Sequence, residues 1–244
     1  MPKSTLKRLP PKKRPRKAKA NTRGAVAGDT LLPELTGEAL AVKAAIEKVG
    51  GVVTGQYRDP LGGNPLLLAV LPVDQVEPTP FQRDVSDSHH KRLADVIDRT
   101  GLFLDPIIAI TAPKGGFWTP NGGHRLAAMR RLGAKAITVL VVPKREVAWQ
   151  ILALNTEKAH NLKDKSLEVI RIFRNLLEDR ADKPEKEFGY YFEEAAFITL
   201  GLCYEQAPRF SGGVYNSFVR RLTTFSGESL ATSLAMHDRH AAIL

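Results

Sequence analysis

Two adjacent glycines are followed by a histidine and an arginine where a strand is expected to end and a helix to begin. These residues are Gly122, Gly123, His124 and Arg125. A helix N-terminus can hold an anion, because its first N–H groups lack intrahelical partners and face the positive end of the helix dipole. Glycines allow close approach to the backbone, and the planar guanidinium of an arginine can hold two phosphate oxygens. A tight turn without a ligand is the alternative.

Two further polar clusters lie at connections between predicted elements. Gln82 and Arg83 occupy the turn before a helix, and Asn155 begins a polar run near the end of a later helix. Arg83 is a second candidate for phosphate oxygens. Asn155 and Glu157 carry oxygen donors of the kind that suit Mg²⁺, which keeps its waters and bridges phosphates. The three clusters together predict a phosphate-binding site with a metal, while spacing alone leaves the tight turn open.

Alternating helical and apolar segments position the first two of these clusters. Apolar spacing and glycine or proline punctuation predict two helices, at 36–49 and 88–101, and a third that follows the Gly-Gly turn and ends at Leu132. Strands are expected in 64–76, 105–111 and 136–142, with a hairpin-like return at 114–118. This pattern predicts a compact α+β unit of roughly residues 64 to 143, built around a small mixed sheet.

The remainder of the chain has helical periodicity only. Amphipathic segments predict helices at 145–160, 166–180, 190–206 and 214–225. We therefore expect three parts: a basic tail over 1–30, an α+β phosphate-binding domain over 31–158 and a helical domain over 159–244.

The positive charge of the protein is concentrated in its first residues. Ten of the 36 lysines and arginines fall within residues 1–23, which contain no acid, so 26 basic residues face 26 acidic ones in the rest of the chain. Proline content and the lack of large apolar residues predict a disordered tail. Such a tail can bind DNA phosphates, or it can serve only as a solubilising extension. The candidate DNA ligands in it are Lys12, Lys13, Arg14, Arg16 and Lys17.

Composition also limits the class of protein. The single cysteine, Cys203, excludes an internal disulfide and a cysteine-rich zinc site. The sequence has no stretch apolar enough to span a bilayer, and its first residues lack the apolar segment of a secretory signal. A cytoplasmic protein without a membrane partner is the expectation.

The order of these motifs resembles the N-terminal domain of ParB-type partition proteins, which has a ParB/sulfiredoxin-like fold. The resemblance runs from about Leu71 to Leu177. The family's first box ends in Gln-Arg, as at Gln82 and Arg83 here, and its Gly-Glu-Arg-Arg box matches the segment from Gly122 to Arg125. Its third box, which contains an asparagine, matches 155–162.

This resemblance implies a nucleotide-sensing, DNA-binding protein of plasmid or chromosome partition, or of related regulation. In the family the box binds the triphosphate of CTP with Mg²⁺, and the nucleotide turns a homodimer into a clamp around DNA. CTP or another nucleoside triphosphate, Mg²⁺, DNA and a ParA-type ATPase are therefore the expected ligands and partners, and the nucleoid or a plasmid is the expected location. Gly123, His124 and Leu154 replace two glutamates and an arginine of the family pattern. These departures favour a phosphate cradle with at most slow hydrolysis.

Other activities of proteins with this fold require different residues at these positions. Sulfiredoxin requires a nucleophilic cysteine, and Gly123 occupies that position here, so this activity is excluded. A nuclease or a phosphoryl-transfer enzyme would need Asp105, Glu157 and Asp164 to gather around a metal. A third alternative is a degenerate member of the family that uses only its basic tail.

A second DNA-binding segment is suggested by position. Residues 190–225 stand where partition proteins carry a helix-turn-helix, and Arg220 and Arg221 lie on its last predicted helix. The long connection before that helix favours a degenerate form of the motif. An ordinary helical cap is the alternative.

Overall fold

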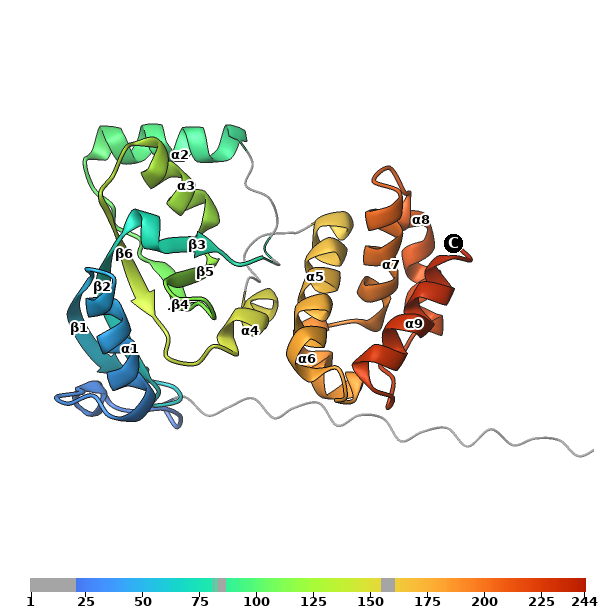
Figure 1. The fold of residues 1–244 in the computed structure, drawn as a ribbon, viewed down its shortest axis with the longest axis horizontal. Coiled ribbons are helices and arrows are strands. Elements are labelled where there is room, and N and C mark those ends of the chain that lie inside the picture. Colours follow the sequence, from blue (N-terminus) through green and yellow to red (C-terminus); the bar gives the residue numbers. More distant parts are fainter. Residues whose placement is uncertain (1–20, 81, 83–86, 155–160) are drawn as a thin grey trace, which may run out of the picture.

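The computed structural model describes residues 21–80, 82, 87–154 and 161–244, with the side chains of 151–154 outside that description. An α+β region formed by the first half of the chain lies beside a helical region formed by the second half (Figure 1). Helix α4 (Val147–Leu154) stands between them. The expected fold class, an α+β region followed by a helical region, is confirmed.

The described residues of the first region form a six-stranded mixed sheet in the order β1-β2-β6-β4-β5-β3. Its strands are β1 (Val52–Arg58), β2 (Pro65–Pro72), β3 (Val76–Pro78), β4 (Ile107–Thr111), β5 (Phe117–Asn121) and β6 (Ala136–Val141). The pairs β1–β2, β2–β6 and β4–β5 are antiparallel, and the pairs β4–β6 and β3–β5 are parallel.

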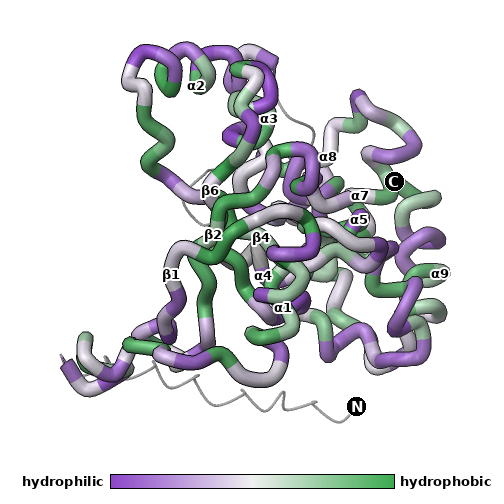
Figure 2. The backbone as a smooth tube through the Cα atoms, turned by 60° about the vertical axis from the view of Figure 1, so that its left-hand side comes forward, coloured by the Kyte–Doolittle hydropathy of each residue, from purple (hydrophilic) through white to green (hydrophobic). Residues whose placement is uncertain are grey.

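One face of this sheet packs against helices α1 (Gly37–Lys48) and α3 (Gly123–Arg131). Leu67, Ala69 and Leu71 alternate along β2 with partly exposed residues and are fully buried. This period-two pattern places every second side chain in the core. Figure 2 shows the apolar colouring concentrated along β2 and the strands near it, with polar segments on the outer helices.

The opposite face leads into the helical region. Ile110, Trp118 and Val142 share a core cluster with Trp149 of α4 and with helices that follow it. Helix α2 (Asp87–Thr100) packs instead on α3 and buries only Ala94. Figure 1 shows α2 at the outer edge of the α+β region.

The helical region consists of α5 (Leu162–Arg180), the 3-10 turn η3 (Glu185–Phe188), α6 (Gly189–Phe192), α7 (Ala195–Gln206), α8 (Gly212–Leu222) and α9 (Leu230–Ala241). Helix α7 is buried along nearly its whole length and packs most extensively on α5. Among the described helices, none has the length and apolar content needed to cross a membrane.

The structure differs from the sequence-based expectation in several elements. The strand expected over 64–76 is divided into β2 and β3 by the 3-10 turn η2 (Val73–Gln75). Strand β1 and helix α9 were not expected. The helix expected at 190–206 is broken into α6 and α7 at Glu193, whose φ of 60° cannot continue an α-helix. Lys165 of α5 forms an ion pair with Glu193 and so anchors this break. The expected boundary at 158/159 lies outside the described residues.

Candidate anion-binding site

Gly122 is required by the path of the chain between β5 and α3. It has a φ of 142°, which side-chain-bearing residues rarely adopt, and it is the N-cap of α3. A Cβ at this position would lie 2.4 Å from Cγ2 of Ile107 and 3.2 Å from Oγ1 of Thr119. Gly122 therefore lets the backbone lie close to the side chains of Ile107 and Thr119, where a residue with a Cβ would clash.

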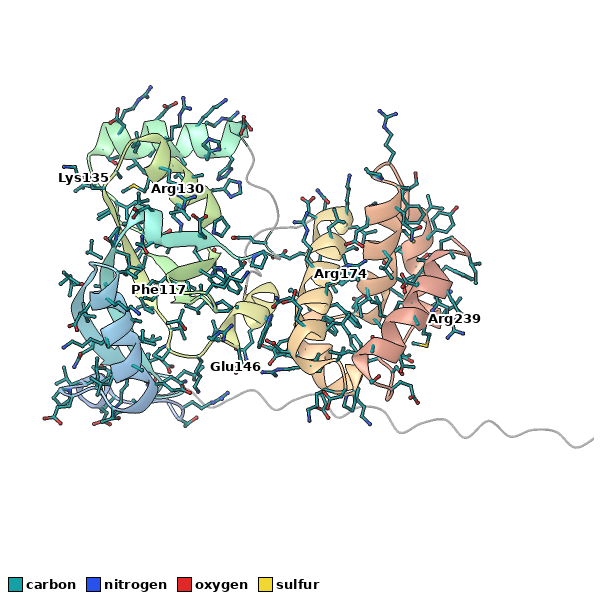
Figure 3. All side chains as sticks on the ribbon, in the orientation of Figure 1. Phe117, Arg130, Lys135, Glu146, Arg174 and Arg239 are labelled. Atoms are coloured by element: carbon teal, nitrogen blue, oxygen red, sulfur yellow. The ribbon has the colours of Figure 1, made fainter. Side chains whose placement is uncertain are left out.

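The N-terminus of α3 carries no side-chain cap. Gly122 cannot offer one, and the first turn contains no acidic residue. The other end of the helix is held to β3 by Arg130, which donates to the carbonyl oxygen of Val76 at 2.7 Å and to the Glu77 carboxylate at 2.8 Å (Figure 3). The helix is thus fixed, and the positive end of its dipole lies at Gly122 and Gly123.

Three side-chain oxygens beside this helix end are buried and have no hydrogen-bond partner among the described residues. They are Oγ1 of Thr79, Oγ1 of Thr119 and Oε1 of Gln82. Thr119 is fully buried and Thr79 is 3% exposed. The Gln82 amide lies against Gly123, with Oε1 3.2 Å from the place where a Cβ would stand.

Backbone contacts hold these three residues next to one another. The N–H of Thr79 donates to the carbonyl of Thr119 at 3.4 Å, and the N–H of Gln82 donates to the carbonyl of Thr79 at 3.1 Å. Buried hydroxyl and amide groups are normally hydrogen-bonded, so oxygens of this kind beside a helix N-terminus indicate a ligand-binding place. We call Thr79, Gln82, Thr119, Gly122 and Gly123 the α3 cradle.

Thr79 and Thr119 were not singled out in the sequence. Thr79 stands between two prolines, and Thr119 lies inside β5, where threonine is an ordinary strand residue. Their burial and their lack of partners arise only when β3, β5 and α3 come together, so no local pattern could have identified them.

The two charged residues of the predicted motif have contacts of their own. Nη1 of Arg125 lies 2.7 Å from the Asp105 carboxylate and donates to the carbonyls of Asp105 and Pro106. Arg125 thus fixes the entry to β4, and its role as a phosphate ligand stays a prediction. His124 faces His89 at the start of α2, with ring centroids 4.6 Å apart.

Several predicted ligands fall outside the described residues. They are Arg83, Asn155, Glu157 and the tail residues Lys12, Lys13, Arg14, Arg16 and Lys17. Among the described residues, no group of three or more histidine, cysteine, aspartate or glutamate side chains could hold a metal. Of the acids needed for nuclease chemistry, Asp105 pairs with Arg125, and Asp164 accepts a hydrogen bond from the Asn161 amide.

Helix α8, the predicted second DNA-binding segment, carries both arginines and exposed apolar side chains. Arg220 of α8 forms an ion pair with Glu194, with its Nε 2.6 Å from Oε2. Arg221 is exposed, but so are Val214, Phe218 and Leu222, which recur every fourth residue along α8. An exposed apolar stripe is not what a base-reading helix presents, since that role needs polar side chains. DNA binding by Arg220 and Arg221 stays a prediction.

No family model and no curated protein matches this chain. Solved structures do match. Sulfiredoxin from Arabidopsis thaliana is 27% identical over 30% of this chain and 82% of its own, with a TM-score of 0.27. The C-terminally truncated chromosome-partitioning protein ParB from Caulobacter crescentus, complexed with CTP-gamma-S, is 17% identical over 70% of this chain and 96% of its own, with a TM-score of 0.33.

A second structure of the Caulobacter crescentus ParB is complexed to the centromeric parS site. It is 12% identical over 72% of this chain and 99% of its own, with a TM-score of 0.34. The neighbours thus include ParB and sulfiredoxin, the families that the sequence resembles. At these TM-scores the functional conclusion rests on the residues of this chain.

Proposed function

We propose that this protein binds a nucleoside triphosphate through the α3 cradle and binds DNA, as a nucleotide-sensing member of the ParB-like group. The observation that carries the proposal is the set of three buried oxygens without described partners at an uncapped helix N-terminus. Two of them are threonine hydroxyls, which can donate to phosphate oxygens. The Oε1 oxygen of Gln82 only accepts hydrogen bonds, so Gln82 would donate to a phosphate through its Nε2 group, which carries two N–H donors and lies 3.5 Å from the Cβ position of Gly123.

The electrostatics of the cradle favour an anion over a cation. The first turn of α3 has no acid, and the helix dipole places positive potential at Gly123. The family's metal-binding glutamate is absent at this position. We therefore expect phosphate binding to depend on the N–H and hydroxyl donors, and Asn155 and Glu157 would supply oxygen ligands if Mg²⁺ accompanies the nucleotide.

Titration calorimetry with ATP, CTP, GTP and UTP tests the proposal. The measurements use the full chain, with and without Mg²⁺ and with duplex DNA present. We expect saturable binding of at least one triphosphate below millimolar concentration, and a clear preference among the four bases would identify the ligand. Absence of binding by all four at millimolar concentration, with DNA present, contradicts the cradle.

DNA affinity is assigned to the basic tail. Residues 1–23 carry ten cationic side chains, and the rest of the chain is balanced. Neutralising about six phosphates corresponds to a slope near −5 in a plot of log affinity against log salt concentration. We expect deletion of residues 1–23 to flatten that slope, measured by fluorescence anisotropy with a labelled duplex. An unchanged slope would contradict DNA binding by the tail and favour the interpretation of the tail as a solubilising extension.

A further inference from the structure

A residue of the helical region reaches the cradle from far along the sequence. Arg171 of α5 donates from Nη1 to the carbonyl oxygen of Gln82 at 3.0 Å, across 89 positions. The contact is partly buried. A charge-assisted hydrogen bond in such a place is among the stronger polar contacts that a protein makes.

Arg171 is presented by a rigid part of α5. Ile170, Ile172 and Phe173 beside it are fully buried in the core of the helical region. Four residues further along the same face, Asn175 accepts a hydrogen bond from the Trp149 indole at 3.0 Å. This face of α5 therefore contacts the Gln82 turn at one point and α4 at another.

Both backbone polar groups of Gln82 are hydrogen-bonded. Its N–H donates to Thr79 and its carbonyl accepts from Arg171, while its side-chain amide lies against Gly123. A backbone fixed at two points has little freedom to rotate, so the amide is aimed at the N-terminus of α3. Loss of the Arg171 contact would remove this donor from the Gln82 carbonyl.

We propose that Arg171 is a positioning residue through which the helical region sets the geometry of the α3 cradle. The expected effect of Arg171 on nucleotide affinity rests on the proposed function. In this role Arg171 acts through Gln82. It fixes Gln82, and Gln82 lines the place where the phosphate binds. By reciprocity of linked equilibria, a ligand that stabilises Gln82 in this position also strengthens the contact to α5.

The test compares Arg171→Met with a matched control, Arg174→Met, in the full chain. Arg174 lies on the same helix but pairs with Glu205 of α7 at 2.7 Å (Figure 3). Both changes remove one arginine charge from α5 and keep an unbranched side chain. Only the first removes a contact to Gln82.

Hydrogen exchange without nucleotide gives the first readout. In Arg171→Met the N–H groups of Thr79 and Gln82 should exchange roughly tenfold faster than in the wild type, a change of about 1.4 kcal/mol in local opening. Arg174→Met should leave both unchanged. Equal exchange in the two variants overturns the positioning role, whether or not nucleotide binds.

Nucleotide affinity gives the second readout. We expect Arg171→Met to weaken triphosphate binding roughly fivefold or more, and Arg174→Met to leave the dissociation constant at the wild-type value. If wild-type protein binds no triphosphate, the proposed function fails while the exchange result still decides the role of Arg171. If Arg171→Met does not fold, Arg171→Lys is compared with Arg174→Lys instead. We then expect a smaller increase in the exchange rates of the Thr79 and Gln82 N–H groups, and the absence of any increase overturns the proposal.

Discussion

The orphan hydroxyl of Thr119 allows a prediction in which stability and affinity change in opposite directions. Thr119→Val keeps the shape and the β-branching of the side chain but removes the hydroxyl. That hydroxyl is fully buried and has no hydrogen-bond partner among the described residues. Burying an unpaired hydroxyl costs about 1–3 kcal/mol, so its removal should raise the free energy of unfolding by about 1 kcal/mol.

Nucleotide binding should respond in the other direction. In the complex the hydroxyl donates to a phosphate oxygen, and a hydrogen bond to a charged group contributes about 1.5–3 kcal/mol. Its loss should weaken triphosphate binding by roughly ten- to a hundredfold. Urea denaturation without ligand measures the first quantity, and titration calorimetry measures the second. The strand should be unaffected, since valine and threonine both favour β structure.

Thr199→Val is the matched control. Thr199 is as deeply buried as Thr119, but its Oγ1 lies 2.8 Å from Nδ1 of His237, so its hydroxyl has a partner. Its removal should lower the free energy of unfolding by about 1–3 kcal/mol and leave the nucleotide dissociation constant unchanged. A Thr119→Val protein that loses stability and keeps wild-type affinity would refute the reasoning.

Three further predictions concern Arg125, Asp59 and His237. Arg125→Ala should lower the free energy of unfolding by about 1–2 kcal/mol, because Asp105 and the start of β4 lose their hydrogen-bond donor. It should also lower triphosphate affinity roughly tenfold, and unchanged affinity in calorimetry excludes Arg125 as a phosphate ligand. Backbone N–H groups of Gly62 and Asn64 lower the pKa of Asp59 to about 2, so its contribution is present above pH 3.8 and lost as pH falls towards 2. Asp59→Asn should reduce stability at pH 7 by about 1–2 kcal/mol and reduce the loss of stability between pH 4 and 2 in denaturant titrations; equal acid sensitivity in both proteins contradicts this role. His237→Ala should lower the free energy of unfolding by about 1–3 kcal/mol, because it leaves the buried carboxyl group of Glu185, 2.8 Å from Nε2, without that hydrogen-bond partner; a thermal denaturation midpoint near the wild-type value would show that the contact is dispensable.

Much of the fold could be predicted from periodicity. The apolar run of β2, the helical spacing of α2 and α5, and the glycines around α3 are local signals. Each led to the correct type of element, although the strand expected over 64–76 extended beyond β2. Strand β1 was not predicted. It contains Gly55, a residue that is unfavourable in strands, and it pairs with β2. Pairing between strands is a tertiary contact, and intrinsic propensity does not report it.

The motif at Gly122 and Gly123 was determined by the sequence alone. A glycine pair before a helical run predicts an open helix N-terminus, and the structure places one there, with a φ at Gly122 that requires glycine. The concentration of charge in residues 1–23 is likewise a property of the sequence. Both follow from residue type and order, because local backbone conformation and net charge need no distant partner.

The composition of the α3 cradle was decided by the tertiary structure. Thr79 and Thr119 are separated by 40 positions and meet only because β3 pairs with β5 in parallel. Arg125 was expected to bind phosphate, yet the loop before β4 supplies it with acceptors. Arg171 contacts Gln82 across 89 positions of the chain, so this hydrogen bond forms only when α5 and the Gln82 backbone are brought together in the folded protein. Partners in a hydrogen bond are chosen by position in space, and the sequence order of a chain does not give that position until the sheet and the helices have packed together.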